Sequence, residues 1–181
     1  MKAFLILLSV LFVVSTHSMA GVEKKVYGYI EKVRVSDAGI LLTAKLDTGA
    51  KSASLDATDI REVEEDGIPY LLFRVLDGNG GSVELKQKYI GNVRIKMRTE
   101  KSKSNKKRLA ERLVVMMPIQ VGEEKRDIRV NLTNREHFLY PLLLGREAIE
   151  AFDGIVDPKL AFTIDVGQII SAPEQRKIEA G

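Results

Sequence analysis

The stretch Leu46–Ile60, "LDTGAKSASLDATDI", places an acidic residue, Asp47, at the end of an apolar segment. The preceding residues 39–45, "GILLTAK", have the composition of a buried strand. An Asp after such a strand can present its carboxylate at a cleft, while a glycine nearby allows close backbone approach. Taken alone, Asp47-Thr48-Gly49 also fits an ordinary polar turn that closes a hairpin. The rest of the sequence has to decide between these two alternatives.

Short apolar segments separated by turn residues fill most of the chain, which is the pattern of strands and turns. These segments are rich in Val, Ile, Leu and Tyr, and Gly, Asp, Asn or Pro bound them. The predicted strands are residues 25–35, 39–46, 70–76, 82–90, 92–98, 108–121 and 125–133.

Helical signals are confined to two segments. Gly145–Phe152, "GREAIEAF", has good helix formers and predicts two turns. Residues 172–180, "APEQRKIEA", are expected to be frayed at the C-terminus. The sequence therefore predicts an all-β domain with one short helix, built as a sandwich or a closed barrel.

The N-terminus has the layout of a secretory signal peptide. Residues 1–20 contain one basic residue, an apolar run of about a dozen residues, and a small-x-small ending at Ala20. The run is shorter than the ~20 residues that a membrane-spanning helix needs. We expect cleavage after Ala20, a periplasmic or secreted protein, and no stable membrane anchor in the mature chain. The absence of cysteine excludes disulfides and a lipid-modified cysteine.

The mature chain, from residue 21 onwards, is long enough for one domain with a real core. We expect this domain to cover residues 21–170 and to be followed by a flexible tail, residues 171–181. The full chain has 28 basic and 25 acidic residues, so the loss of Lys2 leaves 27 against 25. Within Lys86–Arg112, however, 11 residues are Lys or Arg and only two are Glu. The sequence thus predicts a hairpin with a strongly basic tip around residues 99–107.

A second motif changes the interpretation of Asp47-Thr48-Gly49. Residues 140–149, "YPLLLGREAI", form an apolar segment that ends in Gly145 and enters the predicted helix. Together with the basic hairpin, these motifs resemble the retropepsin-like aspartic peptidases. The chain is most similar to a bacterial branch often labelled ATP-dependent zinc protease, through "KLDTGAKSASL", "LTNR", "LLGR" and "VDP". The resemblance covers about residues 26–166 and departs at Ala53, where many members have Ser.

The resemblance implies a retropepsin-like closed barrel whose single Asp-Thr-Gly makes half of an active site. Aspartic proteolysis needs two carboxyl groups that share a proton, so Asp47 would meet its symmetry mate in a homodimer. Thr48 and Gly49 would complete the catalytic loop, with Ala50, Lys51 and Ser52 on the cleft floor. Leu144, Gly145 and Arg146 would support the loop, with Asp56 or Asp59 as the partner of Arg146. The basic hairpin would act as a flap over a protein or peptide substrate, including acidic ones, through the residues Arg98, Lys101, Lys103, Lys106 and Lys107.

Neither cofactor in the branch label has support in the residues. The chain has two histidines, no His-Glu-x-x-His motif, and no phosphate-binding Gly-x4-Gly-Lys-Ser/Thr loop. His137 is therefore predicted to be a loop residue, and we expect no metal and no other cofactor. The alternative to an aspartic endopeptidase is a non-catalytic periplasmic binding module that uses the basic hairpin to hold an anionic peptide or polymer. Nucleic-acid binding is disfavoured by export and by the few aromatic residues in the hairpin.

Overall fold

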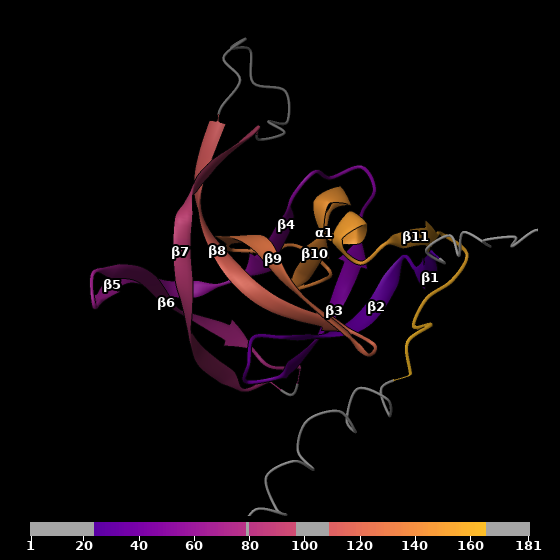
Figure 1. The fold of residues 1–181 in the computed structure, drawn as a ribbon, viewed down its shortest axis with the longest axis horizontal. Helices are drawn as coiled ribbons and strands as arrows, with labels where there is room; N and C mark the ends of the chain where they lie inside the picture. Colours follow the sequence, from indigo (N-terminus) through magenta and orange to yellow (C-terminus); the bar gives the residue numbers. More distant parts are fainter. Residues whose placement is uncertain (1–23, 79, 97–108, 166–181) are drawn as a thin grey trace, which may run out of the picture.

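The computed structural model describes residues 24–78, 80–96 and 109–165, and this part of the chain is almost entirely β-structure (Figure 1). It contains one helix, α1 (Arg146–Ala151). The strands are β1 (Lys25–Gly28), β2 (Ile30–Val35), β3 (Ile40–Leu46), β4 (Ala53–Asp56), β5 (Thr58–Glu65), β6 (Ile68–Leu76), β7 (Ser82–Lys96), β8 (Leu109–Val121), β9 (Glu124–Thr133), β10 (Leu142–Leu144) and β11 (Gly154–Asp157).

Six strands form a closed barrel in the order β2-β3-β10-β4-β9-β8. The ring closes where β2 pairs with β8, through Arg34 opposite Gln120 and Val35 opposite Ile119. Closure leaves no free edge in this ring, which is how a barrel avoids unpaired backbone groups. The structure confirms the predicted all-β fold and selects the closed barrel over the sandwich.

The remaining strands of the same sheet, β7-β6-β5, continue from β8 as an arm (Figure 1). Buried side chains of β6 and β7, including Phe73 and Leu85, belong to the core cluster. β7 and β8 are the long strands of the predicted basic hairpin. The sequence predicted separate strands over residues 82–90 and 92–98, and a bulge at Gly91, with φ 114°, joins them into β7. β5 and β6 turn at Asp66 and Gly67, which both have positive φ, as a two-residue hairpin turn requires.

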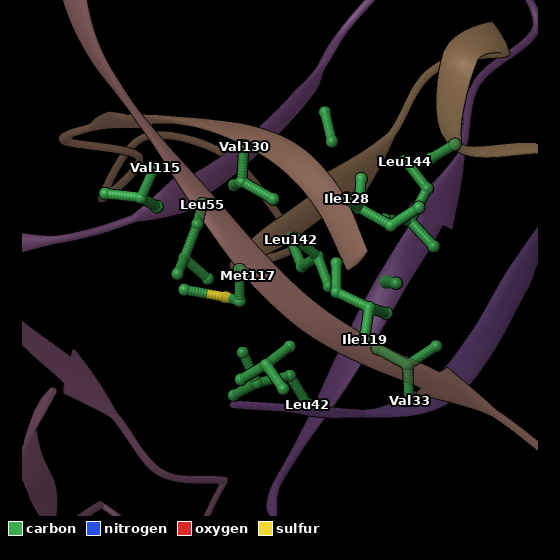
Figure 2. Packing of buried hydrophobic residues seen from close by; sticks show 14 of the residues in the cluster. Val33, Leu42, Leu55, Val115, Met117, Ile119, Ile128, Val130, Leu142 and Leu144 are labelled. Atoms are coloured by element: carbon green, nitrogen blue, oxygen red, sulfur yellow. The ribbon is translucent and has the colours of Figure 1, made fainter. Parts of the chain in front are cut away.

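Alternating side chains of the barrel strands form the core. In β3 the buried residues are every second one, from Ile40 to Leu46. Figure 2 shows buried side chains from β2, β3, β4, β8, β9 and β10 meeting inside the barrel, including Leu42, Leu55 and Met117. Apolar burial of this kind contributes roughly 1.5–3 kcal/mol for each large side chain.

The predicted strand 25–35 is interrupted at Tyr29, which corrects the expectation of one continuous element. β1 leaves the barrel and pairs in parallel with β11, whereas β2 remains in the barrel. At the break, the backbone N–H of Tyr29 donates to Leu160 O at 2.9 Å, and Tyr29 O accepts from Leu46 N at 2.9 Å. The break therefore ties the end of β3 to the segment that follows β11.

The predicted signal peptide and the predicted C-terminal tail lie outside the described residues. Among residues 24–78, 80–96 and 109–165, no helix has the length and apolar character needed to cross a bilayer.

Candidate active site

Asp47 lies directly after β3, and backbone hydrogen bonds hold it on three sides. Its N–H donates to Leu144 O at 2.8 Å, and its carbonyl oxygen accepts from Ala50 N at 3.1 Å. Its carboxylate Oδ1 accepts from Gly49 N at 2.9 Å. The side chain keeps 29% of its surface exposed, so the carboxylate is fixed in direction and still reachable by solvent.

Lys45 is the charged side chain beside this carboxylate, with its Nζ 3.5 Å from Asp47 Oδ2. Residues 45 and 47 stand two apart, so their side chains project to the same face of the chain. Sequence reasoning assigned no function to Lys45. The signal that could have found it is this spacing of two at a strand end.

Gly145 allows the end of β10 to pack directly under the Asp47 loop, residues 47–52. A Cβ at this position would lie 2.6 Å from Ser52 O and 2.8 Å from Lys51 O. The backbone after Gly145 continues the contact: Arg146 N donates to Ala50 O at 2.9 Å, and Glu147 N donates to Lys51 O at 3.1 Å. The free N–H groups at the start of α1 are thus satisfied by loop carbonyls.

The Arg146 side chain also holds the Asp47 loop. Its Nη1 donates to Thr48 O at 2.9 Å and to Gly49 O at 3.2 Å. Both predicted site segments, residues 47–52 and 144–146, therefore come together as one unit.

The expected partners of Arg146 were wrong. Asp56 Oδ1 instead accepts from the backbone N–H of Arg135 at 2.6 Å, and Asp59 Oδ2 lies 3.5 Å from Arg74 Nη1. Arg146 pairs with carbonyl oxygens because the loop turns its backbone, rather than an acidic side chain, toward the helix.

An open cleft of about 1000 Å³ begins at this loop and continues under the β7–β8 hairpin. The predicted floor residues Lys51 and Ser52 line it, but Ala50 does not appear in its lining. Lys51 Nζ lies 3.5 Å from Glu147 Oε1. The lining residues are Gly49, Lys51, Ser52, Val93, Arg94, Ile95, Val114, Arg129, Asn131, Arg146 and Glu147.

The cleft has a positive character, of which the sequence analysis predicted only the part supplied by Lys51 and Arg146. Four of its lining residues are cations, Lys51, Arg94, Arg129 and Arg146, against the single acid Glu147. Arg94 on β7 and Arg129 on β9 are exposed and make no ion pair with any residue that the structure describes. The predicted substrate-binding residues of the hairpin tip, Arg98, Lys101, Lys103, Lys106 and Lys107, lie outside the described residues.

Asn131 connects the β7–β8 hairpin to the end of the Asp47 loop. Its Nδ2 donates to Ser52 Oγ at 3.3 Å and to the carbonyl oxygen of Ala53, and its Oδ1 accepts from Arg112 Nη1 at 3.0 Å. Burial lowers the pKa of the Arg112 guanidinium, because the charged form loses hydration. The sequence analysis assigned no role to Asn131, whereas its side chain is 2% exposed and joins three segments.

No cluster of three or more His, Cys, Asp or Glu side chains able to hold a metal occurs in the described part of the chain. His137 is 89% exposed and lies 3.3 Å from Glu136, in the loop where the sequence placed it.

Comparison with known proteins gives relatives of two kinds. A solved structure of a Legionella pneumophila protein of unknown function is 48% identical, with a TM-score of 0.66, and the match covers 78% of this chain and 98% of that one. Two curated relatives are each named "Probable alpha-L-glutamate ligase". The protein from Shewanella halifaxensis is 29% identical over 68% of this chain and 26% of its own length. The protein from Desulfotalea psychrophila is 29% identical over 86% of this chain and 34% of its own length.

The chain thus spans about a quarter to a third of the length of these curated relatives. A family model described as "Retropepsin-like aspartic endopeptidase RimB" matches residues 26–166, which include the Asp47 loop, the β7–β8 hairpin and Gly145. The chain therefore belongs to the RimB-like family of retropepsin-like proteins.

Proposed function

We propose that this protein is an aspartic endopeptidase that cleaves acidic peptides, with a pair of Asp47 carboxylates from two copies of the chain. The observation that carries the proposal is the Asp47 carboxylate itself. The Gly49 N–H fixes its direction, its side chain remains 29% exposed, and its loop lines an open cleft through Gly49. Family membership supports the same reaction class.

One chain supplies only half of the chemistry. The described chain places one Asp-Thr-Gly loop at the cleft, and two adjacent carboxyl groups are needed because they share a single proton. A two-fold homodimer would bring Asp47 and its mate together at the axis, with Thr48, which is exposed, on the same loop.

The reaction then balances as a hydrolysis. The ionised carboxylate removes a proton from water, whose oxygen attacks the peptide carbonyl carbon. The protonated partner donates its proton to the carbonyl oxygen, and a tetrahedral diol forms. Collapse of the diol breaks the C–N bond. The first carboxyl group gives the proton that it took from water to the leaving nitrogen, and the second, now ionised, takes a proton from a diol hydroxyl, which restores the starting pair. The products are one acid and one amine, and no cofactor is consumed.

The charge of the cleft supports an acidic substrate. Arg94 and Arg129 are exposed cations without acidic partners among the described residues, so their field attracts carboxylates. The relatives named as ligases of α-L-glutamate contain a segment similar to this chain. We therefore propose peptides rich in α-linked glutamate as the first substrates to test. We propose, from the predicted signal peptide, that this activity lies outside the cytoplasm.

The test compares purified wild type with Asp47→Asn on α-linked oligoglutamate, oligoglutamine and an unbiased peptide mixture. Asp127→Asn, a change at an exposed residue of β9, is the matched control. Wild type and the control should cleave oligoglutamate, and Asp47→Asn should lose cleavage while it remains folded. Cleavage by Asp47→Asn at the wild-type rate would remove Asp47 from the mechanism.

The basic cleft also favours a second candidate function, a binding module for anionic peptides without catalysis. Such a module would bind oligoglutamate with equal affinity in wild type and Asp47→Asn, and neither would release products. Mass spectra of the incubated peptides separate the two functions directly.

A further inference from the structure

Lys45 is the cation that the structure places next to the Asp47 carboxylate. Its ammonium lies 3.5 Å from Asp47 Oδ2, and its side chain is 44% exposed. An ion pair this exposed contributes little to stability, because water screens it and two mobile side chains must be ordered. Stability alone therefore gives no physical reason for a cation beside the catalytic carboxylate.

The surroundings of Lys45 form a shallow face outside the barrel core. Within β3, Leu41, Thr43 and Lys45 are partly exposed, while the alternate residues point into the core. Leu143 on β10 stands opposite Lys45 in the parallel register and is partly exposed. Ile30 on β2 stands opposite Lys45 on the other side but is only 5% exposed. Leu143 is therefore the accessible apolar neighbour of Lys45 in these two registers.

From this geometry we propose that Lys45 recognises an acidic side chain of the residue next to the scissile bond. This inference rests on the proposed function and extends it from a general attraction for anions to a defined subsite. The partly exposed neighbour Leu143 would contact the methylene groups of a glutamate. The Lys45 ammonium would pair with its carboxylate, a charge-assisted hydrogen bond in a partly dehydrated position.

Two-fold symmetry gives the proposal a second consequence. A homodimer places one Lys45 on each side of the paired Asp47 residues. Acidic side chains would then be preferred on both sides of the scissile bond, so a Glu-Glu bond would be cleaved best. Arg94 and Arg129 line the cleft toward the hairpin and would act on residues farther from the bond.

The experiment first maps the bonds that the full-length wild type cleaves in a peptide mixture and then varies the flanking residues. Matched peptides carry Glu or Gln on each side of the bond, and kcat/KM is measured for each. Wild type should prefer Glu by roughly tenfold to a hundredfold, the range expected for one hydrogen bond to a charged group. Lys45→Met should reduce the Glu-to-Gln ratio to about one, and Lys45→Arg should retain most of it.

Lys125→Met is the matched control, because Lys125 also forms an exposed ion pair, with Asp37 at 2.8 Å, far along the chain from the site. It should keep the wild-type ratio. Lys45→Gln serves as the second neutral variant if Lys45→Met does not fold. A Glu preference that survives in the neutral variant would overturn the inference and leave the proposed function standing. An equal loss of kcat/KM for Glu and Gln peptides in the neutral Lys45 variant would also overturn the inference and leave the proposed function standing. A wild-type protein that cleaves nothing would overturn the inference and the proposed function together.

Discussion

The backbone N–H of Asp47 donates a 2.8 Å hydrogen bond to the carbonyl oxygen of Leu144, so the last residue of β10 directly fixes the residue that carries the carboxylate. The two residues are far apart in sequence but adjacent through the parallel pairing of β3 and β10. The pairing of β3 with β10 therefore builds the site. Changes in β10 or at Gly145 should act on the Asp47 loop without altering Asp47 itself.

Gly145→Ala should destabilise the protein and disturb the loop together. The added Cβ would lie 2.6 Å from Ser52 O, closer than real Cβ atoms approach oxygen, so backbone must move. Overpacking of this kind costs about 1–3 kcal/mol. Urea unfolding measures the loss. Gly78→Ala is the control, because its new Cβ would meet only Leu41 O at 3.4 Å. Equal stability of the two variants would contradict the packing described here.

Glu31 should hold the segment after β11 against the barrel. Its carboxylate is fully buried and accepts from Gly28 N at 2.7 Å, Thr163 N at 3.1 Å and Ile164 N at 3.2 Å. Glu31→Ala should cost roughly 2–4 kcal/mol because these donors lose a charged acceptor. Hydrogen exchange should show faster exchange at the Thr163 and Ile164 amides, with Glu31→Gln intermediate. Unchanged exchange at both amides would contradict this anchoring.

The Tyr27 phenol should make the folded protein less stable at alkaline pH. Burial raises the pKa of its phenol to about 12, from an ordinary value of 10.0. The folded state therefore holds the proton more tightly than the unfolded chain, so this contribution is complete below pH 10 and is lost as pH rises towards 12. The loss should be about 2–3 kcal/mol over that window, at 1.36 kcal/mol for each pH unit.

Tyr27→Phe removes this titration and supplies the control. The Tyr27 hydroxyl is buried and has no hydrogen-bond partner among the described residues, so its removal should cost little at neutral pH. The unfolding free energies of Tyr27→Phe and wild type should diverge between pH 10 and 12, with wild type losing more. Parallel curves across that window would show that the phenol ionises equally easily in both states.

Local patterns predicted the parts of the fold whose signals are local. The alternation of apolar residues in Ile40–Leu46 was sufficient to predict β3, because burial of one face of a strand produces this pattern. The helix formers after Gly145 were sufficient to predict α1. β5 was missed because its residues Thr58–Glu65 are mostly exposed and polar, and it pairs only with β6 at the end of the arm. The break at Tyr29 was missed because β11, the partner of β1, lies far along the chain.

The candidate site divides in the same way. The motif around Asp47 and the Leu144–Arg146 segment were identified from residue types and order. The other features of the site depend on which strands become neighbours, and the order of strands in the sheet determines that. These features are the carbonyl partners of Arg146, the link through Asn131, and the cations Arg94 and Arg129. Sequence charge therefore pointed to the hairpin tip, whereas the described cleft obtains its charge from strands β7 and β9 and from α1.

The most direct test of the paired-carboxylate claim is subunit mixing at constant wild-type concentration. Asp47→Asn chains are added in threefold excess, time is allowed for exchange, and cleavage of the preferred peptide is measured. If both copies must supply Asp47, only wild-type pairs are active, and the rate should fall to about a quarter of its starting value. Asp127→Asn in the same excess should raise the rate. A rate that stays unchanged in the presence of Asp47→Asn, under conditions where mass measurements show mixed dimers, would contradict the shared active site.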